Sequence, residues 1–136
     1  MNAAVRNTLA VIAGFFALAM AKYVATKLGN AVIPPPAGVD LSTMEGFKAA
    51  IPLYSATQWL PVFFEHAVGS LVGGAVAALV AVSHRMKLAL GIGALHMVGG
   101  LVAASMLPFP MWVVAVDLVA MYLPMAWLGG KLGSRA

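Results

Sequence analysis

Residues 61–80 read PVFFEHAVGSLVGGAVAALV, an apolar run that carries two ionisable side chains, Glu65 and His66, near its start. A helix needs about 20 mostly apolar residues to cross the hydrocarbon of a bilayer. The stretch has that length, so it predicts a membrane-spanning helix. A charge at the centre of such a helix costs about 2.5–3.5 kcal/mol on insertion, so Glu65 and His66 mark the first place to look for function.

The composition of the whole chain also points to a lipid environment. Of its 136 residues, 62% are hydrophobic and 9% are charged, whereas soluble domains carry about 25% charged residues. There are no cysteines, which excludes disulfides, thiolate metal sites and cysteine nucleophiles. The net charge is +4, but the basic residues are scattered and form no patch suited to nucleic acid. We expect a single transmembrane domain over residues 1–136, with the lipid bilayer as its surroundings and no nucleic-acid partner.

Three further segments resemble the first in length and hydropathy, so the chain has four expected spans: 7–28, 61–82, 88–107 and 111–128. The connectors 83–87 and 108–110 are short, so the last three spans must turn back on one another. The pattern predicts an all-α fold, an integral membrane four-helix antiparallel bundle with a structured extracytoplasmic loop at 29–60.

The long loop contains two pairs of residues with the spacing of a helix capping box. Ser42 and Glu45 predict a short surface helix, and Ser55 and Gln58 predict that the second span begins near residue 56. Tyr54, Trp59 and Trp112 are expected at the outer membrane boundary and Trp127 at the inner one, where amphipathic rings prefer to lie.

Orientation follows from the basic residues that flank the spans, which are enriched on the cytoplasmic side. With both termini cytoplasmic, five basic residues lie inside and three lie outside or near the outer boundary. We therefore expect a multi-pass protein of the bacterial inner membrane with a cytoplasmic N-terminus and C-terminus. A competing interpretation is a secretory signal, because Arg6, the apolar run 8–18 and the small residues 19–21 have that layout.

Small residues recur every four positions along the spans, as they do where membrane helices pack closely. Glu65 and His66 each begin such a stripe, and His96 begins another on the third span. The ionisable residues should therefore face protein rather than lipid. The glycines expected at helix contacts are Gly14, Gly69, Gly73, Gly74 and Gly100.

Four polar residues from three spans share the outer half of the membrane when depth is counted at 1.5 Å per residue from the outer helix ends: Lys22, Glu65, His66 and Asp117. The central hypothesis is that Lys22 pairs with Glu65, Asp117 or both, with His66 at the rim. Alternatively, Lys22 extends to the interface and Glu65 is an ordinary first-turn acid. Pro124 deprives the carbonyl of Ala120 of its helical donor and predicts a kink in the fourth span.

Other chemistries have weaker support. His96 is counted about four residues deeper than His66, so one haem iron could not reach both; it is expected to pack against a carbonyl or Ser105. Ser70, one turn from His66, is the nearest approach to a nucleophile–base pair, but that spacing is more typical of packing. Glu65, His66 and Asp117 have no metal-site spacing motif. We therefore expect no catalytic residues, no metal and no cofactor.

Three stretches, VIPPPAGVD (32–40), FFEHAVGSLVGGAVAAL (63–79) and YLPMAWLGGKL (122–132), resemble small bacterial inner-membrane proteins with four spans and no assigned activity. The resemblance covers nearly the whole chain and implies fold and location only. Small multidrug exporters and DoxX-like proteins share the architecture. The acidic residue in the first span on which small multidrug exporters depend is absent from residues 7–28, which argues against proton-coupled drug export.

Two classes of function remain. The first is a non-catalytic accessory or scaffold subunit, or a self-associating bundle, with a homo-oligomer or a larger membrane complex as its partner. The second is a small carrier or ligand-binding protein whose outer-half polar site is formed by Lys22, Glu65, His66 and Asp117. A metal-dependent membrane enzyme comes third. The short helices leave little internal volume, which favours the first class.

Overall fold

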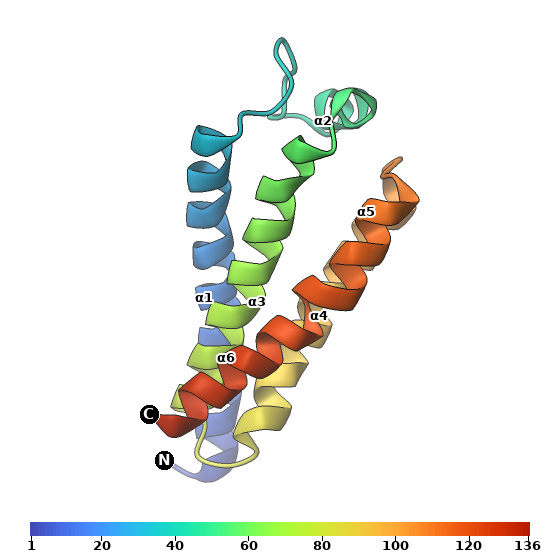
Figure 1. Cartoon of the computed structure of the whole chain (residues 1–136). Helices are drawn as coiled ribbons and strands as arrows, with labels where there is room; N and C mark the ends of the chain where they lie inside the picture. The colour runs from blue at the N-terminus through green and yellow to red at the C-terminus, as the bar shows by residue number, and fades with distance from the viewer.

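The computed structural model describes all residues from 1 to 136, and every regular element in it is helical (Figure 1). In chain order these are α1 (Ala3–Val32), α2 (Met44–Ala50), two 3-10 turns (Ile51–Leu53 and Thr57–Trp59), α3 (Leu60–Val80), α4 (Arg85–Met106), α5 (Met111–Val116), a π-helical turn (Asp117–Met121) and α6 (Leu123–Arg135). Four helical stretches are long and apolar enough to cross a membrane: Ala3–Val32, Thr57–Val80, Arg85–Met106 and Met111–Arg135. The prediction of an all-helical chain with four long apolar helices is confirmed.

The helix ends differ from the expected spans 7–28, 61–82, 88–107 and 111–128 for local reasons. The first helix starts at Ala3 because the Asn2 side chain accepts a hydrogen bond from the Val5 amide at 2.9 Å, which caps it. The second helix ends two residues early, and the third begins at Arg85 directly after His84, whose φ of 53° turns the chain. The last helix continues to Arg135 because its glycines pack against a neighbouring helix.

The capping predictions in the long loop are partly wrong. Thr43, not Ser42, caps α2 by accepting the Gly46 amide at 3.0 Å, because the Ser42 hydroxyl donates to Asp40 instead. Gln58 does accept the Ser55 amide at 2.9 Å, and its side-chain amide donates to the Pro34 carbonyl at 3.1 Å. That cap begins a 3-10 turn, and the α-helical part of the second span starts at Leu60.

α3 lies at the centre of the fold and packs against α1, α4 and α6. Close approach depends on glycine: a Cβ at Gly73 would lie 2.8 Å from the Leu18 Cβ, and one at Gly74 would lie 2.7 Å from the Ala126 carbonyl oxygen. Gly14 has the same role from the side of α1, where a Cβ would lie 2.9 Å from the Gly73 carbonyl oxygen. Figure 1 shows α5 leaning away from α1 and α3 at the end where α2 lies.

Both chain termini lie at the opposite end from α2 (Figure 1), and side chains tie the elements together there. The Arg6 guanidinium donates to the Val80 carbonyl at 3.0 Å, and the Asn7 amide donates to the Ser83 hydroxyl at 2.8 Å. The Arg85 guanidinium donates to the Ser134 carbonyl at 3.3 Å. These bonds link α1, the α3–α4 turn and α6 into what we call the terminal clasp.

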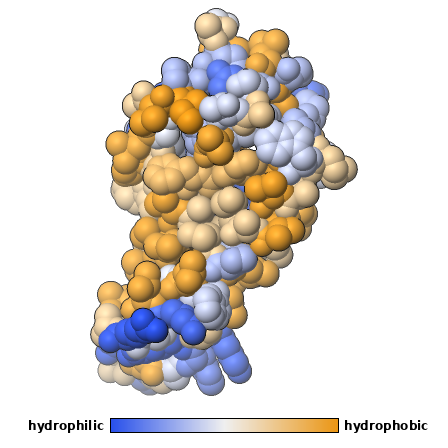
Figure 2. Space-filling model, in the orientation of Figure 1, coloured by the Kyte–Doolittle hydropathy of each residue, from blue (hydrophilic) through white to orange (hydrophobic).

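The face of the molecule drawn in Figure 2 is apolar over its middle, whereas hydrophilic residues gather at its two ends. Large hydrophobic side chains are exposed along the helices, among them Phe16, Met20, Val102 and Val119. Trp59 is buried within the protein. It is only 1% exposed and packs with Ile51, Phe63 and Val113 beneath the loop, because the 3-10 turn at Thr57–Trp59 directs it inward.

Candidate ligand-binding site

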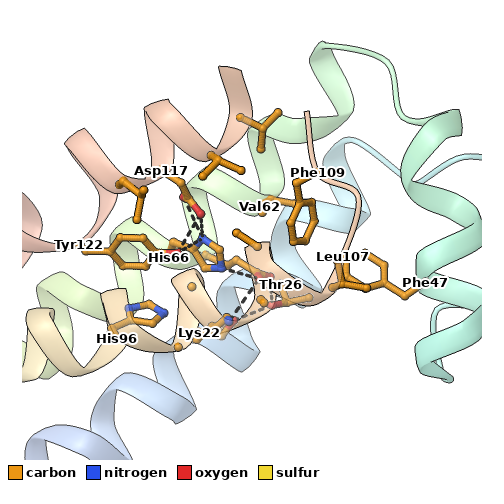
Figure 3. Close-up of a pocket in the computed structure, with 18 of the residues that line it drawn as sticks. Lys22, Thr26, Phe47, Val62, His66, His96, Leu107, Phe109, Asp117 and Tyr122 are labelled. Atoms are coloured by element: carbon orange, nitrogen blue, oxygen red, sulfur yellow. Dashed lines mark hydrogen bonds and ion pairs between the residues drawn. The ribbon is translucent and has the colours of Figure 1, made fainter. Parts of the chain in front are cut away.

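A cavity of about 460 Å³ occupies the half of the molecule nearer α2. All four long helices and the loop with α2 contribute to its wall. One end of the cavity is polar and the other is apolar (Figure 3). The polar end holds Lys22, Thr26, Glu65, His66, His96, Asp117 and Tyr122, and the apolar end holds Phe47, Leu107 and Phe109.

Glu65 faces α1. Its Oε1 lies 3.7 Å from the Lys22 Nζ, and its Oε2 accepts a hydrogen bond from the Thr26 hydroxyl. The same hydroxyl lies 2.8 Å from the Lys22 carbonyl oxygen of its own helix, so it shares its one hydrogen between two acceptors. The Glu65 side chain is 16% exposed and that of Lys22 is 36% exposed. Thr26 was not among the predicted residues, although its place one turn after Lys22 puts it on the same helix face.

Asp117 pairs with His66 rather than with Lys22. Its carboxylate oxygens lie 2.7 and 2.9 Å from the His66 Nδ1, and the Tyr122 hydroxyl donates to Asp117 Oδ2 at 2.8 Å. The other ring nitrogen of His66 lies 3.6 Å from Glu65 Oε1. His66 is therefore not at the rim: its ring bridges the two carboxylates, and its side chain is 14% exposed.

The π-helical turn brings Asp117 and Tyr122 together. In a regular α-helix, residues five apart point in clearly different directions, because a turn takes 3.6 residues. The wider turn at Asp117–Met121, followed by the break at Tyr122 with φ −103° and ψ −81°, places both side chains at one carboxylate contact. Pro124, in the first turn of α6, cannot supply the donor that Ala120 lacks, which is the local reason for the irregularity. The sequence indicated the kink through Pro124 but gave no sign of the role of Tyr122.

His96 lies beside His66 but contacts Ser70, one turn further along α3, which agrees with the greater depth counted along the helices. The two rings meet edge to face with centroids 5.3 Å apart. The Ser70 hydroxyl lies 2.8 Å from the His96 Nδ1, and Ser105 bonds only to the Val102 carbonyl of its own helix.

Ser70 and His96 thus form a hydrogen-bonded serine–histidine pair, whereas the sequence indicated only Ser70 and His66. Ser70 is fully buried, so its hydroxyl is not presented to a substrate. The His96 Nε2 is buried and has no hydrogen-bond partner. A buried polar atom without a partner costs about 1–3 kcal/mol, and here it belongs to a residue of the cavity wall.

Two of the expected packing glycines make room for the polar side chains. A Cβ at Gly100 would overlap the Tyr122 hydroxyl. A Cβ at Gly69 would lie 3.3 Å from the His96 ring and 3.4 Å from the Lys22 Cβ. The small-residue stripes therefore position the network as well as the helices.

Tyr54 joins the cavity wall from the loop, where it stacks on Trp59 with ring centroids 4.6 Å apart. Its partial burial, and secondly the charge of Glu65, raise the pKa of the Tyr54 phenol above its ordinary value of 10.0. The phenol therefore stays neutral at physiological pH. By contrast, hydrogen bonds from Ser42 lower the pKa of the exposed Asp40, which is not one of the residues that line the cavity.

Glu65, His66 and Asp117 belong to one network, but no group of three His, Cys, Asp or Glu side chains is arranged so that it could hold a metal ion. Compared with family models, curated proteins and solved structures, the chain gives no match. What the fold and site define is a class: a four-helix apolar chain with a half-enclosed cavity that is polar at one end.

Proposed function

We propose that this chain is a multi-pass protein of the bacterial inner membrane, in which the four long helices form an antiparallel bundle with both termini cytoplasmic. The apolar middle and hydrophilic ends in Figure 2 support insertion, since exposed apolar surface of this extent is unfavourable in water. The excess of basic residues on the side of the termini supports the orientation.

Within that membrane setting, the protein binds a small amphipathic molecule. The observation that carries this proposal is the cavity of about 460 Å³, with ionisable groups at one end and aromatic and aliphatic side chains at the other. Ligand sites are usually clefts of about 300–1,000 Å³, mostly apolar, with a few convergent polar groups. The ligand would place its polar head beside Glu65, His66 and Asp117 and its apolar body against Phe47 and Phe109.

The cavity favours ligand binding over the scaffold hypothesis. The volume that four short helices were expected to lack is present between α4, α5 and the other two helices. The glycines expected at helix contacts pack within the chain, where Gly73 meets Leu18 and Gly74 meets Ala126. They are thus already engaged in contacts with other helices of this chain. An accessory or self-associating role stays a prediction.

The test uses two glycines on α4 that differ in one respect. A Cβ at Gly99 or at Gly91 meets no atom within 4 Å, but only Gly99 lines the cavity. Gly99→Leu should fill the cavity, whereas Gly91→Leu adds the same side chain elsewhere on the helix. The probes are 4-phenylbutylamine, 4-phenylbutanol and 4-phenylbutyrate, which share a body and differ in head charge.

Binding is measured by isothermal titration and by the rise in thermal unfolding temperature in detergent, because a ligand that binds only the folded state stabilises it. At least one probe should bind the native chain and Gly91→Leu alike, and bind Gly99→Leu at least tenfold more weakly. If no probe binds, or if the two leucine variants behave identically, the cavity is not a ligand site.

A further inference from the structure

We propose that the ligand carries a cationic head, and that this head and a proton on His66 occupy the polar end of the cavity alternately. The inference rests on the proposed function and names the class of ligand, an amine or quaternary ammonium with an apolar body. It is argued from the charges that line the cavity and from the geometry around His66.

The formal charges of the ionised side chains at the polar end of the cavity do not sum to zero. Lys22 contributes one positive charge, and Glu65 and Asp117 contribute one negative charge each, so the sum is −1 when His66 is neutral. An uncompensated charge within a membrane helix bundle is costly. The site is therefore complementary to one additional positive charge.

His66 can supply that charge as a proton. Its Nδ1 lies 2.7 Å from Asp117 and its Nε2 lies 3.6 Å from Glu65, so each ring nitrogen faces a carboxylate oxygen. Only the imidazolium has a hydrogen on both nitrogens. A neutral ring would turn a lone pair toward one of the two carboxylates.

The other groups around His66 do not remove the imbalance. Lys22 on α1 is paired with Glu65. The Tyr122 hydroxyl, from the fourth span, donates to Asp117 without adding charge. His96 on α4 meets His66 edge to face and holds the Ser70 hydroxyl at its Nδ1. Asp117 thus depends on His66, or on a ligand, for a positive partner.

The apolar end of the cavity selects the rest of the ligand. Phe47 and Phe109 lie edge to face with centroids 6.0 Å apart, and Tyr54 lies in the same wall. Aromatic rings accept alkyl and aryl groups and also attract cations to their faces. A phenylalkyl or alkyl ammonium ion matches both ends of the cavity.

The exchange balances in charge and protons. One ammonium ion enters, its head lies between Glu65 and Asp117, and the proton of His66 leaves to water, so the site stays neutral. The affinity for 4-phenylbutylamine should therefore rise with pH wherever the ligand-free chain carries the proton on His66. The measurement covers about pH 5.5 to 8.5, where an alkyl amine remains protonated because its pKa is near that of lysine, about 10.4. The rise should be at most tenfold per pH unit.

Isothermal titration in two buffers that differ in ionisation enthalpy reports the proton directly. We expect close to one proton released per bound 4-phenylbutylamine at the acidic end of the range. For 4-phenylbutanol we expect no proton release and no pH dependence. Equal affinity for the two probes at every pH would overturn the inference.

Removing a negative charge and removing a positive charge from the cavity should change the affinity for 4-phenylbutylamine in opposite directions. If these side chains only stabilised the fold, no such opposition would be expected. Asp117→Asn should weaken 4-phenylbutylamine binding at least tenfold, and Lys22→Gln should strengthen it, whereas 4-phenylbutanol changes little in either. The matched control is Glu45→Gln, since Glu45 is an exposed acid on α2 outside the cavity lining. If Asp117→Asn fails to fold, Lys22→Gln and the proton count still decide the question.

The two proposals fail separately. Suppose that 4-phenylbutanol or 4-phenylbutyrate binds the native chain but not Gly99→Leu, and that 4-phenylbutylamine does not bind. The cavity is then a ligand site, but the proposed cationic class of ligand is wrong. If no probe binds in that manner, the proposed function falls and the cationic inference falls with it.

Discussion

Gly100 shows how much of the site depends on single residues. The Tyr122 side chain is 1% exposed, and its hydroxyl rests where a Cβ of residue 100 would lie. From that position the hydroxyl donates to Asp117 at 2.8 Å. The lack of a side chain at Gly100 therefore leaves room for the Tyr122 hydroxyl that donates to Asp117.

Gly100→Ala should displace Tyr122 and break its hydrogen bond to Asp117. A hydrogen bond to a charged group is worth about 1.5–3 kcal/mol, so we expect the free energy of unfolding to fall by an amount of that order. The measurement is reversible unfolding in mixed micelles. Gly99→Ala is the control, because a Cβ there meets no atom within 4 Å. Equal stability of the two variants would mean that Tyr122 does not depend on Gly100.

At the residue scale, the sequence predicted which ionisable side chains lie near one another more readily than which of them pair. Lys22, Glu65, His66 and Asp117 stand out because charge is rare in apolar spans, and all four line the cavity. Which of these side chains pair with one another depends on the tilt of the helices and on the wider turn after Val116. No pattern of residues in the sequence predicts either feature. Thr26 and Tyr122 were missed because neutral hydroxyls are common in membrane helices and carry no comparable signal.

Among the helices, α6 has the tightest contact with α3. A Cβ at Gly129 would overlap the Leu71 carbonyl oxygen and lie 2.8 Å from the Ala75 amide nitrogen, and a Cβ at Gly133 would overlap the Ala75 carbonyl oxygen. The two helices thus touch backbone to backbone over one turn. This contact lies at the end of the molecule away from the cavity.

Gly129→Ala should force α6 away from α3 and destabilise the fold by about 1–3 kcal/mol, the usual cost of overpacking. Gly91→Ala, an open position on α4, should have no cost and should gain up to about 1 kcal/mol from the higher helix propensity of alanine. Unfolding free energies of the two variants in the same micelles give the comparison. A destabilisation of Gly91→Ala as large as that of Gly129→Ala would contradict the contact.

At the scale of elements, the sequence predicts a helix reliably where its run of apolar residues is long. Runs of about 20 apolar residues gave four helices, while their ends moved by up to seven residues because caps and glycine contacts set them. The last helix shows the limit. The kink could be expected from Pro124, but a π-helical turn is a choice of hydrogen-bond register, and the packing of α5 and α6 decides it.

For the whole molecule, the absence of cysteine makes orientation measurable. A single introduced cysteine has no competitor in the chain. If the four helices cross the membrane, Glu45→Cys on α2 and Ser134→Cys near the C-terminus should lie on opposite sides, since the termini and α2 are at opposite ends in Figure 1.

A membrane-impermeant thiol reagent added to intact cells should label Glu45→Cys, and label Ser134→Cys only after the cells are opened. Both residues are exposed, so a difference reports the side of the membrane rather than burial. Labelling of both sites in intact cells would contradict the four-span arrangement, and the reverse pattern would contradict the cytoplasmic termini alone.

The terminal clasp bears on whether a ligand could pass from one end of the protein to the other. Arg6, Asn7 and Arg85 fasten three segments together at one end, mainly through bonds to backbone carbonyls, while the opposite end surrounds a hollow. A ligand that enters from the α2 side therefore reaches a cavity whose opposite end is closed by packed helices. The cavity lining does not include the residues of the terminal clasp, so passage of a ligand through the chain would require the helices to separate where Arg6, Asn7 and Arg85 join them.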